Sequence, residues 1–233
     1  STLRQLATPE VNVCTIEDPI EMVEGAFNQM QVNHSIDLDF SSGVRALMRQ
    51  DPDIIMVGEI RDLETANMAV QAALTGHLVL STLHTNDSPS SISRLLELGV
   101  PAYLIKATVR GIMSQRLVRI LCPNCKVMAA TDLDAWQQLT QPWKVEPPAE
   151  IARPVGCREC RNTGYTGRRG IYEVLVNSPA VQRQITPNLE TATLRKTAMG
   201  EGMHTLPLSG ARRVARGQTT IEEVMRVAPV LDA

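Results

Sequence analysis

The chain has 233 residues, of which 43% are hydrophobic and 21% charged, and its formal net charge is −2. These values are typical of a soluble globular protein with one large or two modest domains. The near-neutral charge argues against nucleic-acid binding, which favours a strongly basic balance. The sequence shows neither a secretory signal peptide nor an apolar run of about 18 residues, so we expect a cytoplasmic protein without a transmembrane segment.

The first half of the sequence alternates strand and helix patterns. Short apolar runs bounded by polar residues predict strands, and longer amphipathic runs predict helices. The predicted strands are VNVCTI (Val11–Ile16), IIMV (Ile54–Val57) and HLVLSTL (His77–Leu83), and the predicted helices are Ser41–Gln50, Leu63–Leu74, Ser90–Leu98 and Ala102–Leu117. Strands separated by helices indicate βαβ units, so we expect an α/β fold with a parallel sheet.

The pattern changes near Cys122. From there to about Gly170 the sequence is rich in Pro, Gly and Cys and has little periodicity, whereas the remainder predicts short helices. Thr220 followed by Glu223 is a capping-box pattern, which predicts the start of one of these helices. We therefore expect three parts, which are residues 1–118, 119–170 and 171–233.

Four of the five cysteines form two C-x-x-C pairs, CPNC and GCREC, separated by residues 126–156. Two such pairs are typical of a structural Zn²⁺ site, because four thiolates fill a tetrahedral coordination sphere. The predicted zinc ligands are Cys122, Cys125, Cys157 and Cys160. Two redox dithiols or incidental thiols are the alternatives. The fifth cysteine, Cys14, lies within a predicted strand and is expected to be a buried apolar residue.

Charged side chains follow each of the three predicted strands. They are Glu17, Asp18 and Glu21 after the first strand, Glu59 and Arg61 after the second, and His84 after the third. In open α/β sheets, ligands bind at the carboxyl ends of the strands. Carboxylates beside Arg and His suit Mg²⁺ with a phosphorylated ligand, and one carboxylate can act as a base toward water. The alternative is that these charged residues belong to ordinary solvated loops. Three successive strands that end in charged residues weaken this alternative.

Three long segments resemble those of a known family. TIEDPIE (Thr15–Glu21), RQDPDIIMVGEIRDLETA (Arg49–Ala66) and TGHLVLSTLHTNDS (Thr75–Ser88) resemble the Asp box, Walker B motif and His box of the secretion ATPase superfamily. GYTGRRGIYEVL (Gly164–Leu175) resembles the segment after the family's zinc loop. The resemblance implies a partial RecA-like sheet with flanking helices, followed by a zinc-binding tetracysteine loop subdomain and a small C-terminal helical subdomain.

Members of this superfamily hydrolyse ATP to power type II secretion and type IV pilus assembly. The resemblance therefore implies an ATPase that uses ATP and Mg²⁺ and forms a homo-hexamer. It also implies inner-membrane platform proteins as partners and a location on the cytoplasmic side of the inner membrane. The tetracysteine loop is similar to that of assembly ATPases rather than retraction ATPases. The sequence does not separate type II secretion from pilus assembly.

The resemblance also implies roles for individual residues. Glu59 corresponds to the catalytic Walker B glutamate, which activates water. His84 corresponds to the His-box histidine that contacts or senses the terminal phosphate. The Asp box supplies carboxylates near metal and water, at Glu17, Asp18 and Glu21.

Two further residues of these motifs each have two alternative roles, and one position departs from the usual pattern. Arg61 either contacts nucleotide or forms a structural salt bridge. His77 either takes part in nucleotide binding or packs at the head of its strand. Many related strands end in Asp-Glu, whereas this one ends in Gly58-Glu59. A carboxylate elsewhere must therefore assist the metal, and the Asp box is the obvious source.

A phosphate-binding P-loop, G-x-x-x-x-G-K-[ST], does not occur in the sequence. By the family's spacing it would end several residues before Ser1, and Thr2 to Leu6 would belong to the helix that follows it. We therefore expect this chain to be the C-terminal part of a longer ATPase and to bind ATP poorly by itself. A natural pseudo-ATPase without a P-loop and a non-enzymatic zinc-stapled interaction module are the alternatives.

Overall fold

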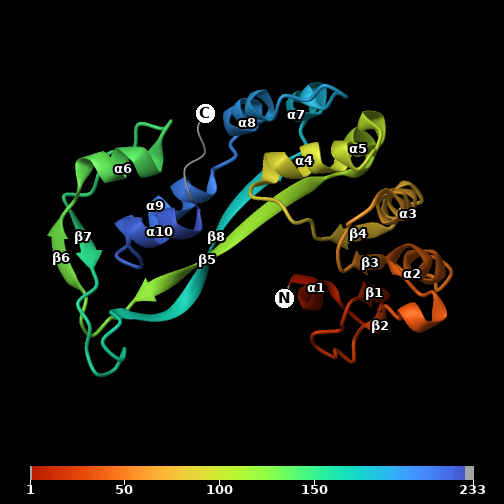
Figure 1. Ribbon diagram of the computed structural model, residues 1–233, viewed down its shortest axis with the longest axis horizontal. Helices are drawn as coiled ribbons and strands as arrows, with labels where there is room; N and C mark the ends of the chain where they lie inside the picture. Colours follow the sequence, from red (N-terminus) through yellow and green to blue (C-terminus); the bar gives the residue numbers. More distant parts are fainter. Residues whose placement is uncertain (1, 229–233) are drawn as a thin grey trace. The chain divides into compact units, whose positions relative to one another are not determined.

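The computed structural model describes residues 2–228 of the chain (Figure 1). In this range the chain forms two compact units, which are described separately. The first unit runs through Arg110 and includes Gln182–Thr191, and the second comprises Gly111–Val181 and continues from Ala192. None of the helices in this range is both long and apolar enough to cross a membrane.

The first unit is built on a four-stranded parallel sheet with the order β2-β1-β3-β4 (Figure 1). Its strands are β1 (Val13–Glu17), β2 (Asn28–Gln31), β3 (Ile54–Val57) and β4 (Leu78–Ser81). Three of them match predicted strands. β2 does not, because its sequence NQMQ contains a single apolar residue and its strand conformation depends on pairing with β1. The parallel sheet with flanking helices confirms the predicted α/β fold class.

Side chains alternate between the two faces of this sheet, as they do along any strand. On one face, α2 (Phe40–Leu47) and α3 (Leu63–Leu74) pack against the strands. The core between them contains Cys14, Ile16, Val44, Leu47, Ile55, Val57, Met68 and Ala72. On the other face, Val13 and Ile54 pack with Leu3 of α1 (Thr2–Leu6). Cys14 is fully buried, as its position in a strand predicts.

The remaining helices before the end of the first unit are short. They are η1 (His34–Ile36), α4 (Ser88–Glu97) and α5 (Ala102–Thr108). Asp62 caps α3 through a hydrogen bond from the Thr65 N–H, and Asp87 caps α4 through one from the Ser90 N–H. Aspartate is a preferred N-cap residue because its side chain satisfies a helix N–H that has no partner within the helix. These caps fix where the chain turns after β3 and β4.

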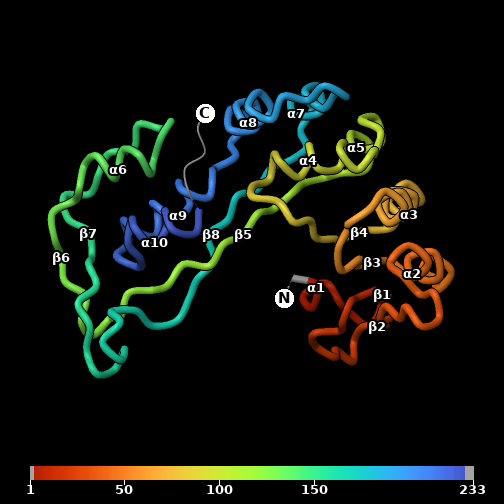
Figure 2. The backbone as a smooth tube through the Cα atoms, in the orientation of Figure 1, coloured from red at the N-terminus to blue at the C-terminus, as the bar shows by residue number. Residues whose placement is uncertain are grey.

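The predicted helix Ala102–Leu117 is wrong in its second half. α5 ends at Thr108, and the strand β5 (Gly111–Leu121) follows it. β5 pairs antiparallel with β8 (Tyr165–Val176), and Figure 2 shows the two strands running side by side. The strand forms because this distant pairing overrides the local helical pattern. Residues 118 and 170 lie inside these two strands, and the three-part division stays a prediction.

The second unit adds a smaller sheet and several helices to this ribbon. β6 (Val127–Ala130) and β7 (Glu150–Arg153) pair antiparallel, and α6 (Leu133–Thr140) lies between them in sequence. The later helices are α7 (Pro179–Gln184), α8 (Thr191–Gly200), α9 (Leu206–Ala215) and α10 (Ile221–Val227). The end of α7 from Gln182 and the first residue of α8, Thr191, belong to the first unit. The main core contains Val118, Trp136, Leu139, Ile151, Ile171, Leu206, Val214 and Val224. The helical C-terminal end agrees with the prediction.

Candidate functional site

The predicted charged residues lie at one edge of the parallel sheet. Glu17 is the last residue of β1, and Glu59 and His84 follow β3 and β4. The register places Ile16 beside Val57, and β3 and β4 are paired in the same direction. Because parallel strands end on the same side of a sheet, their carboxyl ends form a common edge, where α/β proteins bind ligands.

Glu59 is the centre of a small ionic cluster at this edge. Its Oε1 lies 2.5 Å from Nη2 of Arg61, and its Oε2 lies 3.2 Å from Nε2 of His84. The Glu59 side chain is only 12% exposed, whereas those of Arg61 and His84 are 64% and 86% exposed. The hydrogen bond from Arg61 holds the pKa of Glu59 below its usual range, against the opposing effect of burial. Glu59 is therefore an oriented, ionised carboxylate with two exposed partners.

The backbone that carries Glu59 is attached to both neighbouring strands. The Gly58 N–H donates to the Ile16 carbonyl at 2.8 Å, and Thr82 Oγ1 donates to the Gly58 carbonyl at 2.6 Å. A Cβ at Gly58 would lie 3.2 Å from both the Ile16 carbonyl oxygen and a ring carbon of Phe40. Such close contacts require neighbours to move in a packed interior. The crowding explains why glycine suits the position before Glu59.

The three Asp-box carboxylates have different surroundings. Glu17 Oε1 accepts hydrogen bonds from Thr15 Oγ1 at 2.7 Å and from Gln29 Nε2 at 2.9 Å. Asp18 is exposed and lies near Arg61, whose pKa is raised mainly by its hydrogen bond to Glu59 and less by the Asp18 charge.

Glu21 is also exposed, and within residues 2–228 it makes no hydrogen bond or ion pair. The structure thus brings Asp18 to the Glu59 cluster, fixes Glu17 beside β2, and leaves Glu21 in solvent.

A hollow of about 190 Å³ adjoins Asp18 and Arg61. The N-cap residues of α2 and α3, Asp39 and Asp62, belong to its lining. The other lining residues are Val32, His34, Phe40, Ser41, Glu64 and Thr65. Carboxylates outnumber the cationic groups, so the hollow attracts cations and repels free phosphate.

His77 lies at the amino end of β4, opposite the edge that carries Glu59. Its Nδ1 lies 2.9 Å from the Ala72 carbonyl oxygen and 3.0 Å from Thr75 Oγ1. These contacts attach the imidazole to the end of α3. Among the residues that the structure describes, His77 is not brought to the ionic cluster, although the sequence predicts it as a candidate nucleotide ligand.

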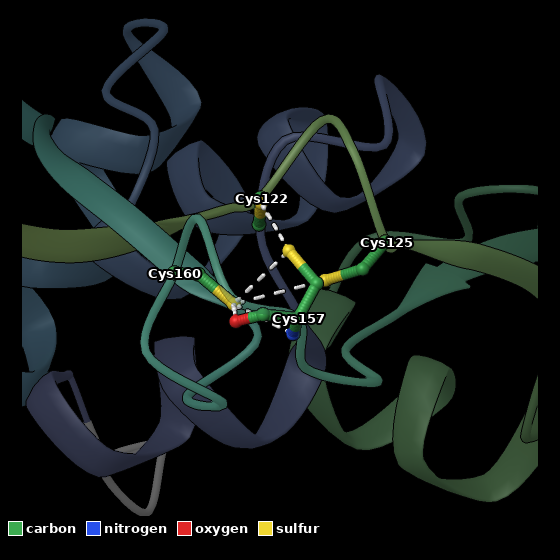
Figure 3. Close-up of side chains that lie close together, drawn as sticks. All are labelled: Cys122, Cys125, Cys157 and Cys160. Atoms are coloured by element: carbon green, nitrogen blue, oxygen red, sulfur yellow. Dashed lines mark hydrogen bonds between the residues drawn. The ribbon is translucent and has the colours of Figure 1, made fainter.

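The four predicted zinc ligands, Cys122, Cys125, Cys157 and Cys160, converge on one point (Figure 3). Their Sγ atoms all lie within 4.8 Å of one another. The Sγ separations are 3.9 Å for Cys122 and Cys157, 3.9 Å for Cys125 and Cys160, and 3.8 Å for Cys157 and Cys160. A tetrahedron with Zn–S bonds of about 2.3 Å has edges of about 3.8 Å. The cluster therefore has the size of a tetrahedral metal site.

Backbone N–H groups point at these sulfur atoms. Gly156 donates to Cys125 Sγ at 3.3 Å, and both Cys157 and Gly164 donate to Cys160 Sγ at 3.2 Å. Burial raises the pKa of Cys160, but these N–H groups outweigh it and lower the pKa to about 6. Burial raises the pKa of Cys125 to about 11. Donors aimed at sulfur stabilise the thiolate form, which metal binding requires, so the residues present fit a tetrahedral metal ion.

Three polar residues that organise the sheet edge are not among the predicted site residues. Thr15 and Gln29 hold Glu17, and Thr82 holds the peptide before Glu59. Thr15 and Thr82 lie inside the motif segments, which is a signal in the sequence for their importance. Gln29 lies in a polar stretch without a recognisable pattern, so its role becomes visible only through the pairing of β2 with β1.

Known proteins show extensive similarity to this chain. The type IV pilus assembly ATPase TfpB of Acinetobacter baylyi is 58% identical over 230 residues, which cover 99% of this chain and 39% of TfpB. The type II secretion system protein E of Aeromonas hydrophila is 41% identical over 227 residues, which cover 97% of this chain and 45% of that protein. The chain thus spans less than half the length of these curated relatives.

Solved structures show the same fold. The pilus retraction motor PilT with bound ADP has a TM-score of 0.70 and 27% identity, and the match covers 99% of this chain and 56% of PilT. The Legionella pneumophila ATPase DotB has a TM-score of 0.67 and 24% identity, with 97% of this chain and 54% of DotB covered. Residues 1–226 match the family described as type II/IV secretion system protein. The chain therefore belongs to the type II/IV secretion system protein family.

Proposed function

We propose that this chain is the C-terminal part of a hexameric ATPase that drives type II protein secretion or type IV pilus assembly. Family membership and the names of the relatives support this assignment. The observation that carries it is the ionic cluster of Glu59, Arg61 and His84 at the carboxyl edge of the sheet. A largely buried, oriented carboxylate beside a guanidinium and an imidazole suits phosphoryl transfer to water.

Glu59 is the general base in this proposal. Its carboxylate is ionised and largely buried, and its backbone is fixed by Gly58 and Thr82. Each of its oxygens has one partner and can accept a further hydrogen bond from the attacking water. The contact with His84 is the longer of the two and involves the more exposed side chain. His84 can therefore turn toward a terminal phosphate while Arg61 keeps Glu59 oriented.

The other site residues surround this base. Bound Mg²⁺ would neutralise charge on the transferred phosphoryl group. Glu17 and Asp18 are the carboxylates placed to hold the ion or its waters, and Glu21 can join them from the exposed part of the Asp box. We keep His77 as a candidate that acts only indirectly, through the junction of α3 and β4. The phosphate cradle itself lies outside this chain in the proposal.

The four cysteines would hold a structural zinc ion, because four thiolates leave no open position for substrate. In the longer protein we expect six copies to assemble and to act on inner-membrane platform proteins from the cytoplasmic side. Hydrolysis at the sheet edge would change how neighbouring subunits dock. The acidic hollow beside Asp18 agrees with weak binding of free nucleotide by this chain alone.

Replacement of Glu59 by glutamine in the full-length protein tests the proposed function. Glu59→Gln keeps the shape and removes the base, so turnover of ATP should fall by a factor on the order of 10² to 10⁴ while nucleotide still binds. Phosphate release at saturating MgATP and equilibrium nucleotide binding measure the two effects. Glu97→Gln is the control, because Glu97 is an exposed residue of α4 that forms an ion pair with Arg94 on the same helix. It should leave turnover unchanged.

Two results would contradict the proposal. Turnover of Glu59→Gln within a few-fold of the unmodified protein would show that water is activated elsewhere. A full-length protein that binds zinc but neither binds nor hydrolyses ATP would indicate an interaction module instead. Reading the coding sequence upstream of Ser1 gives independent information, because the proposal requires a P-loop there.

A further inference from the structure

The Gln29 side chain forms three hydrogen bonds near the Asp box. It lies on β2, opposite Thr15 of β1 in the parallel register. Its Nε2 donates to Glu17 Oε1 at 2.9 Å and to the Met22 carbonyl at 3.0 Å. Its Oε1 accepts from the Glu24 N–H at 2.7 Å. One amide therefore connects the end of β1 with two points on the loop that follows it.

Few other contacts stabilise this loop, the Asp-box loop of residues 18–27 between β1 and β2. Met22 and Val23 are 71% and 89% exposed, so the segment gains almost nothing from apolar burial. Glu24 forms an ion pair with Arg4 of α1 at 3.1 Å, but the Arg4 side chain is 68% exposed. Exposed ion pairs contribute little to stability. The half-buried amide of Gln29 is consequently the main polar anchor of the Asp-box loop.

The same amide orients the Glu17 carboxylate. Thr15 and Gln29 both donate to Oε1. Within residues 2–228, Oε2 has no hydrogen-bond partner. Two donors on one oxygen fix the plane of the carboxylate and leave the other oxygen available. Catalytic groups require this kind of support, because small misplacements lower the rate strongly.

We propose that Gln29 is a positioning residue of the ATPase site, which fixes the Asp-box carboxylate Glu17 for contact with the metal or its water. The inference rests on the proposed function, because it assumes that the sheet edge hydrolyses ATP. It assigns a role to β2, an edge strand that neither contains a predicted site residue nor directly adjoins one in the sequence. Gln29 acts through Glu17 and does not itself touch the reacting atoms.

The sheet offers two variants that separate the effects of Gln29. Thr15→Val removes the other donor to Glu17 Oε1 and leaves the loop contacts at Met22 and Glu24 intact. Gln31→Leu removes the other glutamine of β2. Gln31 lies opposite Glu17 in the parallel register, but within residues 2–228 its side chain accepts a hydrogen bond from Ile20 N–H at 3.3 Å and forms none with Glu17. Thr15→Val tests carboxylate orientation alone, and Gln31→Leu is the matched control.

The test compares Gln29→Leu, Thr15→Val and Gln31→Leu in the full-length protein. A lost hydrogen bond to a charged group that acts in the transition state lowers the rate about 10-fold or more. We therefore expect Gln29→Leu and Thr15→Val to lower kcat for ATP about 10-fold, with KM changed by less than about 2-fold. Gln31→Leu should match the unmodified protein. The Mg²⁺ concentration for half-maximal activity should rise in the first two variants only.

Hydrogen–deuterium exchange without nucleotide gives a readout that does not depend on activity. Gln29→Leu should speed exchange in a peptide spanning residues 20–27, because the Glu24 N–H loses its acceptor. Thr15→Val should not change exchange in that peptide. The two variants should therefore share the kinetic defect and differ in loop protection.

Several results would overturn the inference. These are an unchanged kcat in Gln29→Leu, a defect confined to KM, or an equal loss in Gln31→Leu with none in Thr15→Val. The last pattern would show that loop order, and not the orientation of Glu17, matters for turnover. Failure of the proposed function looks different. In that case the unmodified protein lacks ATPase activity, or Glu59→Gln retains it, and the inference falls with the proposal.

Discussion

Among the residues that the structure describes, Glu223 of α10 is a fully enclosed charged residue. Its side chain is 0% exposed. It accepts hydrogen bonds from the Arg119 N–H at 2.9 Å, from the Arg119 guanidinium at 3.0 and 2.8 Å, and from Arg226 at 3.1 and 2.7 Å. Only half of the predicted capping box forms. Thr220 Oγ1 accepts from the Glu223 N–H, but the Glu223 carboxylate binds arginines instead of the cap.

These contacts make the stability of the second unit depend on pH. Burial would raise the pKa of Glu223, but the hydrogen bonds from Arg226 and Arg119 lower it from 4.5 to about 2. A carboxyl group whose pKa is depressed by folding stabilises the folded state fully above its unfolded pKa. That contribution is lost as the pH falls from about 4.5 through about 2.

Glu223→Gln should destabilise the second unit by about 2–3 kcal/mol at neutral pH, because it removes charge-assisted hydrogen bonds and leaves arginine donors without a charged acceptor. The Glu223→Gln variant should also lose less stability than the unmodified protein between about pH 4.5 and 2. Urea unfolding followed by tryptophan fluorescence measures this, since both tryptophans, Trp136 and Trp143, lie in the second unit.

The neighbouring residue Glu222 is a matched control for this prediction. It pairs with Arg153 but is 66% exposed. Glu222→Gln should cost less than about 1 kcal/mol, as exposed ion pairs do. Equal effects of the two substitutions would contradict the importance assigned to Glu223.

Among the elements, α9 and α10 approach each other closely at Gly210. A Cβ on Gly210 would lie 2.3 Å from Val224 Cγ1, which is far inside van der Waals contact. Glycine in a helix is unfavourable by about 1 kcal/mol relative to alanine. The structure accepts this cost because the packing of the two helices leaves no room for a methyl group.

Gly210→Ala should therefore destabilise the second unit by about 1–3 kcal/mol in spite of its better helix propensity, because an overpacked core forces the helices apart. Gly200→Ala is the control. Gly200 ends α8 with nothing within 4 Å of a built Cβ, so alanine there should be neutral or stabilising by up to about 1 kcal/mol. Urea midpoints of the two variants measure the difference. A stabilising Gly210→Ala would contradict the packing argument.

On the scale of the whole molecule, the chain consists of two units with separate cores. The sheet core of the first unit surrounds Ile16 and Ile55, and that of the second surrounds Val118 and Ile171. The cysteine cluster belongs entirely to the second unit. Small loop-rich segments with little core of their own require a staple of this kind. Loss of metal should therefore affect the second unit and leave the first intact.

The chain should bind about one Zn²⁺ per molecule when purified without added zinc, and Cys122→Ser should lose it. Metal analysis measures the content, and hydrogen–deuterium exchange should show faster exchange within residues 118–170 but not in β1, β3 or β4. Cys14→Ala is the control, because Cys14 lies buried in the core of the first unit and is not a member of the cluster. It should keep the metal. Absence of metal together with an oxidised cysteine pair would contradict the zinc site.

Much of the fold and of the candidate site follows from local sequence. β3 and α3 have the predicted boundaries, because an apolar run with a polar end and an amphipathic run each encode their own element. The identity of the site residues is also local. Glu59 and His84 follow apolar strands, and the cysteine spacing brings each C-x-x-C pair to one point.

Only the tertiary structure decides the features that depend on residues distant in sequence. β2 and the second half of the predicted helix Ala102–Leu117 become strands through pairing with β1 and β8. Distant contacts also pair the Gln29 amide with the Glu17 carboxylate and the Arg119 guanidinium with the Glu223 carboxylate. Local propensity amounts to less than about 1 kcal/mol per residue, and pairing with a distant strand overrides it. The sequence by itself therefore determined which chemical groups the site contains, whereas long-range hydrogen bonding and burial decided which residues orient them.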